Sequence, residues 1–306
     1  MSVHLKMSAA TLFWGTTPTI GRVLAEFEVP FVVVFGRFLV AGIFLALFLI
    51  ATRSFAPIPR RHWLRFLALG ATGMLLHNGL MFKGLEFTDA MTTSIILGLI
   101  AAMVLLLEAV VHRRRPDRVA VVGVLLGFAG TAYVLAGGRP TEIFSLRLGL
   151  GEGLIFLSAL SWAAYSVLGG RLLEEFSPLL VTAVAIWVGT GLLFPFVFEN
   201  PAGSWALASD SRAWLLIFLL GFVGSALGFL WYYEAVVELG GVGTALYINL
   251  VPIYGLISAA LFLGERFRPE IFVGGAMVVV GLTLVNRPGF LRSRRVDAAL
   301  PIPPAR

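Results

Sequence analysis

Long apolar runs alternate with short polar segments from the start of the chain to about residue 286. A bilayer core of about 30 Å requires roughly 20 apolar residues per helix, and a helix satisfies its own backbone hydrogen bonds there. The pattern therefore predicts an all-α membrane protein. We expect ten transmembrane helices near residues 8–25, 30–51, 63–83, 90–111, 119–137, 149–170, 178–198, 212–234, 241–263 and 270–286.

The two halves of the chain share motifs at nearly constant offsets. Trp14 recurs as Trp162, 148 positions later, and Gly73 recurs as Gly224, 151 positions later. Five spans per half is an odd number, so the second half enters the membrane from the opposite side, as in transporters built from inverted repeats. We predict inverted five-helix repeats at residues 1–140 and 141–287, followed by a disordered basic cytoplasmic tail at 288–306. The alternative is that duplication only built a stable helical bundle.

Composition narrows the possible functions. Hydrophobic residues make up 58% of the 306 residues and charged residues 13%, which suits a protein surrounded by lipid. Cysteine is absent, so disulfides, thiolate metal sites and cysteine nucleophiles are excluded. The net charge of +6 is spread between apolar runs instead of forming a soluble basic domain, so we expect no nucleic-acid partner.

The distribution of Lys and Arg predicts the orientation. Of the 23 basic residues, 15 fall on one side of the predicted helix map and 7 on the other, with Arg37 inside the second span. The side richer in Lys and Arg is normally cytoplasmic. We therefore expect an integral protein of the cell inner membrane with both termini in the cytoplasm.

Several motifs resemble a known family. They are Leu12-Phe13-Trp14-Gly15-Thr16, Arg37-Phe38-Leu39-Val40-Ala41-Gly42, Val251-Pro252-Ile253-Tyr254 and Leu263-Gly264-Glu265-Arg266. In this order they resemble EamA-type ten-helix exporters of the drug/metabolite transporter superfamily, which include exporters of aromatic amino acids. The resemblance implies export of small organic metabolites, amino acids among them. The first half departs from the motif, with Leu99 in place of Pro252 and His112 in place of Glu265.

Polar and aromatic residues recur at helical spacing within several spans, which places them on shared helix faces. In the sixth span, Ser158 and Ser166 lie on the same helix face as Trp162 and Tyr165. In the eighth span, Ser225, Gly228 and Tyr232 share one face. We predict a substrate cavity near the middle of the membrane, in which aromatic rings supply stacking surface and polar groups fix the polar end of the substrate. The candidate substrate-binding residues are Trp14, Thr17, His77, Asn78, Met81, Ser161, Trp162, Tyr165, Trp231 and Tyr254. The alternative is helix packing, which we favour for the glycines.

A second set of residues is predicted to form gates or hinges: Pro18, Arg37, Lys83, Glu234 and Pro252. Proline bends a helix and frees a carbonyl one turn earlier, so Pro18 serves either as a hinge or as a source of a carbonyl ligand. Arg37 either clamps a substrate carboxylate or donates to helix-end carbonyls. Lys83 and Glu234 occupy equivalent positions near opposite membrane faces.

The function predicted from these features is secondary transport by alternating access, with export of amino acids or related compounds. His77 is the central residue that could carry protons, with Glu108 near the cytoplasmic end of its span as the alternative, so we expect a facilitator or exchanger instead of an obligate proton antiporter. The alternatives are a structural or lipid-handling membrane protein without a solute cavity and, least favoured, an intramembrane enzyme. No His-Glu-x-x-His motif occurs, and we expect no catalytic residue, metal or cofactor. The expected partners are a small-molecule substrate and the bilayer, and a monomer is compatible with the sequence.

Overall fold

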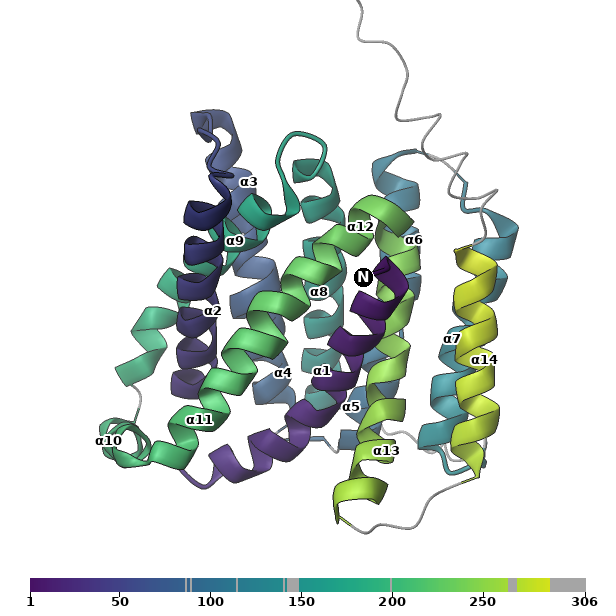
Figure 1. Cartoon of the computed structure of the whole chain (residues 1–306). Helices are drawn as coiled ribbons and strands as arrows, with labels where there is room; N and C mark the ends of the chain where they lie inside the picture. The colour runs from purple at the N-terminus through teal and green to yellow at the C-terminus, as the bar shows by residue number, and fades with distance from the viewer. Residues whose placement is uncertain are drawn as a thin grey trace, which may run out of the picture.

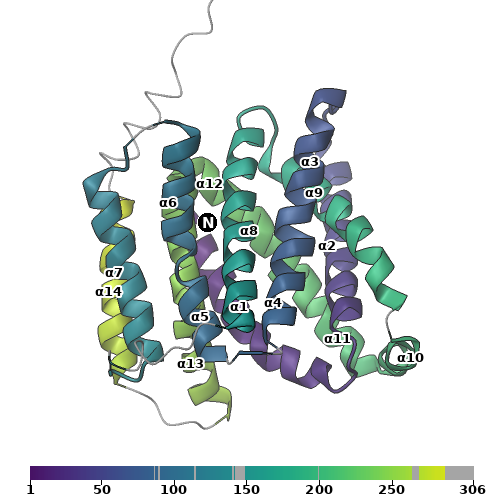
Figure 2. The same cartoon turned by 180° about the vertical axis from the view of Figure 1, so that it is seen from behind.

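The computed structural model describes residues 1–85, 87–88, 90–113, 115–139, 141, 149–198, 200–263 and 269–286, and this part of the chain is helical without strands. The predicted tail at 288–306 and Glu265 lie outside the described residues, and so does the side chain of Pro18. Figures 1 and 2 show a bundle of roughly aligned helices from both halves of the chain.

The helices of the first half follow the apolar runs. They are α1 (Val3–Ala25), α2 (Pro30–Thr52), η1 (Arg60–His62), α3 (Trp63–Gly70), η2 (Ala71–Leu76), α4 (His77–Leu85), α5 (Ala90–Leu97), α6 (Ile100–Val111) and α7 (Arg118–Leu135). The helices of the second half are α8 (Leu150–Leu172), α9 (Pro178–Leu193), η4 (Phe194–Phe198), α10 (Pro201–Ser209), α11 (Ser211–Leu219), η5 (Leu220–Leu227), α12 (Gly228–Ala245), η6 (Leu246–Asn249), α13 (Leu250–Leu263) and α14 (Glu270–Val285).

Local sequence explains where several helices begin. The side chains of Ser2, Asp117 and Ser177 accept hydrogen bonds from backbone N–H groups of the first turns of α1, α7 and α9. Such caps satisfy donors that have no partner inside the helix. Pro30 and Pro178 occupy the first positions of α2 and α9, where the missing N–H removes no helical bond.

Within the described residues, six helical segments are long and apolar enough to cross a membrane. They are Pro30–Thr52, Thr92–Val111, Arg118–Leu135, Leu150–Leu172, Pro178–Phe198 and Ser211–Ile257. The last one contains 47 residues and is broken at Gly240, whose φ of 76° only glycine adopts readily, so it comprises two helices. The shorter apolar helix Glu270–Val285 follows it. The predicted spans at 8–25 and 63–83 fall within α1 and within the run from α3 to α4.

The two halves contact each other through matched helix pairs. Helix α4 packs on α8, and its counterpart α12 packs on α1; α6 packs on α8, and α13 packs on α1. Helices α7 and α14 lie side by side at one edge of the bundle, and α2 contacts α9 (Figures 1 and 2). Exchanging the two halves therefore turns each of these helix pairs into itself or into another pair in the set. Equivalent helices thus have equivalent neighbours.

Two π-helical segments, η2 and η5, occupy equivalent positions in the two halves. Such wide turns are rare and often lie at functional sites. Glycines surround both segments. A Cβ on Gly73 would collide with the ring of Tyr165, and one on Gly221 would lie 2.7 Å from the carbonyl oxygen of Arg37. The prediction that the glycines serve close helix packing is therefore confirmed at these positions.

Candidate functional site

Seven aromatic side chains meet in the middle of the bundle. They are Trp14, Phe38, Trp162, Tyr165, Phe229, Tyr232 and Tyr233, and we call them the aromatic cluster. The indole rings of Trp14 and Trp162 lie 5.9 Å apart, edge to face. Trp162 lies 5.4 Å from both Phe229 and Tyr232, so rings from α1, α8 and α12 form one continuous surface.

Helical spacing brings these rings to the interior. Trp162 and Tyr165 are three residues apart on α8, and Phe229 and Tyr233 are four apart on α12, so each pair shares a helix face. Tyr165 and Tyr233 stack with their ring centroids 4.9 Å apart. Tyr165, Tyr232 and Tyr233 are fully buried, whereas Trp14 keeps accessible surface. The rings of the cluster therefore pack closely against one another, and Trp14 lies on the side of the cluster that keeps accessible surface.

The indole of Trp14 is fixed to η5. Its Nε1 donates a hydrogen bond of 2.7 Å to the carbonyl oxygen of Gly224. Gly228, one turn later, lies against the same indole, since a Cβ at this position would be 2.9 Å from the Trp14 Nε1. Glycine at residue 228 thus leaves the space that the Trp14 ring occupies.

His77 is held by Ser158 across the α4–α8 contact. The Ser158 hydroxyl donates to the His77 carbonyl oxygen at 2.8 Å, and the His77 Nδ1 lies 2.9 Å from the same hydroxyl and 3.2 Å from the Ser158 carbonyl oxygen. The hydroxyl has only one proton to donate, so this geometry assigns a donating N–H to Nδ1 and leaves Nε2 of the neutral ring as an acceptor. The imidazole lies 4.8 Å from the Trp162 ring and remains half-buried.

Two buried donors of the aromatic cluster lack a well-formed hydrogen bond among the described residues: the Trp162 N–H and the Tyr165 O–H. The Tyr232 hydroxyl lies beside the Trp162 indole without completing such a bond, and it bonds to Ser166 instead. The Tyr165 hydroxyl likewise lies beside the Tyr233 hydroxyl. A buried donor without a well-formed bond is unfavourable, so both groups could donate to a ligand once a movement of the helices exposes them.

Other predicted binding residues use their polar groups locally. Asn78 is buried and donates to the carbonyl oxygens of Gly73 and Met74 in η2, at 3.2 and 2.8 Å. The hydroxyls of Thr17 and Ser161 donate to the carbonyl oxygens four residues earlier in their own helices. In these three cases the described hydrogen bonds go to backbone carbonyls of the same helical run.

The remaining predicted binding residues lie at the margins of the cluster. Met81 and Trp231 are half-buried, and among the described residues Trp231 has no aromatic partner. Tyr254 packs beside the core, where α1 and α13 cross closely enough that a Cβ on Gly15 would meet the Tyr254 Cβ at 2.9 Å. The structure thus unites Trp14, His77, Trp162 and Tyr165 and leaves Met81, Trp231 and Tyr254 outside their ring contacts.

The predicted gate and hinge residues with described side chains contact different parts of the bundle. Glu234 forms an ion pair of 2.5 Å with Lys6 at the start of α1. Lys83 lies over the Phe87 ring, 5.7 Å from its centroid. Pro252 is half-buried within α13, and Arg37 donates to Ser225. The described contacts of Lys83 and Glu234 are with different neighbours, and their positions near opposite membrane faces stay a prediction.

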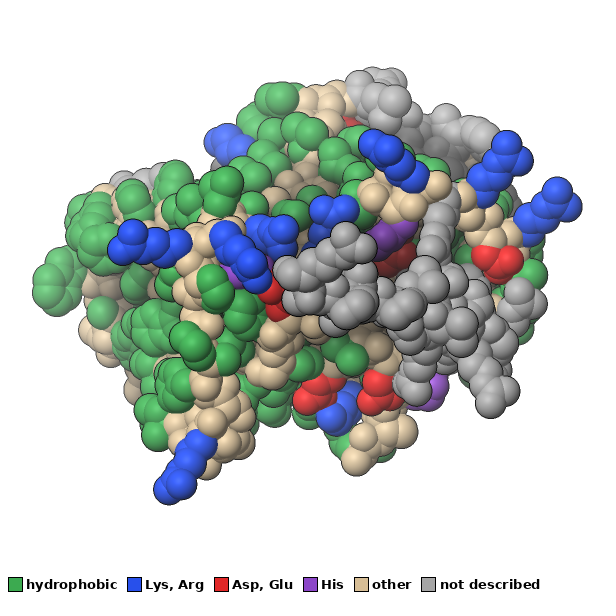
Figure 3. Space-filling view, turned by 90° about the horizontal axis from the view of Figure 1, so that it is seen from above, with side chains coloured by type: hydrophobic (Ala, Val, Ile, Leu, Met, Phe, Trp, Pro, Cys, Tyr) green, Lys and Arg blue, Asp and Glu red, His purple; other side chains and the backbone are tan. Residues whose placement is uncertain are grey.

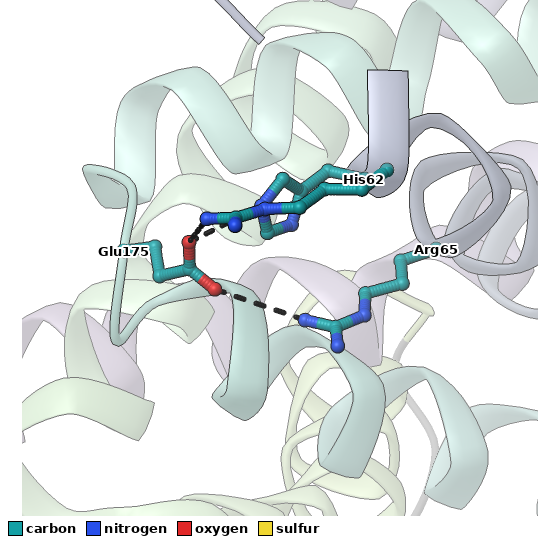
Figure 4. Close-up of polar contacts among 4 residues, drawn as sticks. His62, Arg65 and Glu175 are labelled. Atoms are coloured by element: carbon teal, nitrogen blue, oxygen red, sulfur yellow. Dashed lines mark hydrogen bonds and ion pairs between the residues drawn. The ribbon is translucent and has the colours of Figure 1, made fainter. Parts of the chain in front are cut away.

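Basic side chains and ion pairs gather at one end of the bundle, where α2 and α8 end and α3 begins (Figure 3). The Glu175 carboxylate lies 3.3 Å from Arg61, 3.2 Å from His62 and 3.8 Å from Arg65 (Figure 4). His4 at the start of α1 reaches the Tyr247 hydroxyl at 2.5 Å. These contacts tie α1 to η6, and η1 and α3 to the segment after α8, at the same end.

Three aromatic rings of the cluster were missed by the sequence analysis: Phe38, Phe229 and Tyr233. Each lies in an apolar helix in which a ring that faces lipid and a ring that faces the interior give the same local pattern. The spacing of Phe229, Tyr232 and Tyr233 on one helix was the available signal. Among the described residues, no group of three His, Asp or Glu side chains could hold a metal ion.

Comparisons with known proteins agree with this architecture. The EamA-like transporter family matches residues 1–136 and, separately, residues 149–287. An uncharacterized transporter from Archaeoglobus fulgidus is 30% identical over 290 residues, which cover 92% of this chain and 96% of that protein. A probable terminal-alkyne amino-acid exporter from Streptantibioticus cattleyicolor is 29% identical over 79% of each chain. A solved crystal structure superposes with a TM-score of 0.74 at 19% identity, covering 97% of this chain and 99% of that one.

Proposed function

The chain belongs to the EamA-like transporter family, and from this premise we propose that it exports amino acids or related small organic metabolites by alternating access. It is a membrane transporter by family, and its relatives are transporters. The amino-acid substrate is supported by the related exporter from Streptantibioticus cattleyicolor and by the aromatic character of the cluster.

The proposed architecture is ten spans in two inverted repeats, residues 1–140 and 141–287. Support comes from the separate family matches to the two halves, the exchangeable helix pairings and the equivalent π-helical segments. The exposed basic residues at the end of the bundle seen in Figure 3 support cytoplasmic termini in an inner membrane. They are Arg53, Arg60, Arg61, Arg65, Arg113, Arg115, Arg118 and Arg171.

One observation carries the proposed site: Trp14 and Trp162, which are equivalent in the two repeats, meet edge to face beside His77. Inverted repeats place their shared binding site at the interface between the halves, near the middle of the membrane. Aromatic faces bind the apolar part of a substrate, while the His77 Nε2 and the Trp162 N–H bind its polar groups. Rocking of α1 and α8 against α12 and α4 would expose this site to each side in turn.

Efflux from proteoliposomes over a panel of amino acids tests the proposal. Trp162→Ala and His77→Ala should abolish or reduce efflux at least about tenfold for the preferred substrates, because each removes a ring that contacts the other. Trp205→Ala is the matched control, since the Trp205 side chain is 78% exposed. Parent-like transport of every substrate by both site variants would contradict the assignment.

Labelling of single cysteines separates a carrier from a membrane protein without a solute cavity. The chain contains no cysteine, so Ser161→Cys and Val279→Cys each introduce one thiol. A charged maleimide should label the half-buried residue 161 on α8, and excess substrate should slow the reaction. Residue 279 on the outer face of α14 should stay unlabelled in lipid. Lack of reaction at residue 161 would favour the structural or lipid-handling alternative.

We further propose a facilitator or exchanger. The neutral His77 ring that Ser158 holds serves hydrogen bonding in this scheme and releases no proton during transport. Substrate-dependent acidification in sealed vesicles that disappears in His77→Gln would instead indicate proton coupling through this residue.

A further inference from the structure

Arg37 places a positive charge deep in the bundle. It lies two turns after Pro30, the first residue of α2, so it is about 10 Å along the helix by the rise of 1.5 Å per residue. Its side chain is half-buried, and the next residue, Phe38, belongs to the aromatic cluster, with its ring 5.8 Å from that of Phe229. A charge within a membrane-spanning segment is unfavourable unless it is paired or serves a ligand.

One edge of the guanidinium is fixed by η5. The Arg37 Nε donates to the Ser225 hydroxyl at 2.9 Å, and that hydroxyl donates to the Leu220 carbonyl oxygen at 3.1 Å within the π-helical turn. The Cζ atom lies 5.0 Å from the Phe38 ring centroid. Ser225 uses its single proton on the backbone, so its oxygen is free to accept from Arg37. The planar group is therefore held in a defined orientation.

The opposite edge of the guanidinium, which carries the two terminal nitrogens, has N–H donors that these contacts do not use. Within the described part of the chain, the two terminal nitrogens form no hydrogen bond, and no carboxylate pairs with Arg37. A hydrogen bond to a neutral hydroxyl orients the group without neutralising its charge. Because the guanidinium lies over the Phe38 ring, and Phe38 packs against Phe229, Arg37 lies next to the aromatic cluster.

We infer that the free edge of Arg37 binds the carboxylate of the substrate, which makes the cargo an organic carboxylate with an apolar or aromatic body. Two parallel N–H groups match the two oxygens of a carboxylate, and Ser225 holds the guanidinium as such pairing requires. The body of the substrate then extends over Phe229 and Trp162. This inference rests on the proposed transport function and adds the group that the protein recognises.

The test pairs substrates that differ only at the carboxyl group. 3-Phenylpropionate and 3-phenylpropanamide are compared by ligand-induced thermal shift of the purified protein, and L-phenylalanine and L-phenylalaninamide are compared as inhibitors of proteoliposome efflux. The parent protein should prefer each carboxylate at least about tenfold, because the amide leaves the Arg37 charge unpaired. In Arg37→Gln the carboxylate and the amide should bind about equally well, because carboxylate binding weakens while amide binding stays unchanged. Arg212→Gln, which alters an exposed arginine outside the site, should behave like the parent.

The results separate the inference from the proposed function. Equal binding of carboxylate and amide by the parent, or an unchanged preference in Arg37→Gln, would overturn the inference. If Arg37→Gln does not fold, Arg37→Lys keeps the charge and should lose part of the preference because it lacks two parallel donors. Thermal stabilisation by 3-phenylpropionate in a parent that transports no amino acid would refute the proposed cargo and leave the carboxylate site intact.

Discussion

The two equivalent interfaces between the halves, α1–α12 and α8–α4, are stabilised by different chemistry. At α1–α12, Trp14 donates to the Gly224 carbonyl oxygen in η5, the turn that leads into α12, and Lys6 pairs with Glu234 near the helix ends. At α8–α4, the equivalent Trp162 has no well-formed partner for its N–H, and Leu154 occupies the position that corresponds to Lys6. His77, which corresponds to Gly228, joins the second interface through Ser158 instead.

The difference indicates a division of roles between the duplicated interfaces. At the α1–α12 interface the Trp14 N–H and the Lys6 ammonium both have protein partners, so these two donors are less available to a ligand. The α8–α4 interface keeps an indole N–H without a well-formed hydrogen bond and an imidazole acceptor beside it. Duplication produced the same backbone arrangement twice, and single side chains then made one copy an anchor and the other the better candidate for substrate recognition.

The largest expected effect comes from close packing at η2. Gly73→Ala should lower stability by about 1–3 kcal/mol, because the added Cβ collides with the Tyr165 ring inside a packed interface. Gly224→Ala, the equivalent change, should have a smaller effect since its nearest neighbour is the Phe13 ring at 3.0 Å. The apparent melting temperature in detergent measures both. Gly79→Ala, with its nearest atom at 3.7 Å, is the control, and equal losses at residues 73 and 224 would contradict the difference in packing.

The tryptophan hydrogen bonds provide the next test. Trp14→Phe should lower stability by about 0.5–1.5 kcal/mol, because it removes the donor of the hydrogen bond to the Gly224 carbonyl oxygen. Trp162→Phe removes an N–H that has no well-formed partner, so stability should change little. Thermal unfolding of the two variants under the same conditions gives the comparison. A greater loss in Trp162→Phe would show that its N–H is satisfied in the resting protein.

The smallest expected effect concerns the ion pair at the end of α1–α12. Lys6 and Glu234 are 26% and 30% exposed, so a double-mutant cycle with Lys6→Gln and Glu234→Gln should give a coupling of about 0.2–1 kcal/mol. This coupling should weaken as salt is added, since exposed charges are screened. A cycle between Glu234→Gln and Lys83→Gln should give none, because these residues have different neighbours.

The sequence by itself determined the helical class, the internal duplication and the family. Apolar length and recurring motifs are local properties that can be read without knowing which helices touch. The same is true of Trp14, His77, Trp162 and Tyr165, whose aromatic or polar character stands out within apolar spans. These four were placed on cavity-facing stripes by their spacing alone, and the structure brings them together.

Only the tertiary structure decided which side chains meet. Phe229 and Tyr233 join the aromatic cluster, Glu234 pairs with Lys6, and Arg37 bonds to Ser225, which is 188 positions away. Helical periodicity assigns a residue to a face, but the neighbour of that face depends on how distant helices pack. The physical reason is that lipid and a protein interior are both apolar, so an apolar ring gives the same sequence signal in either environment.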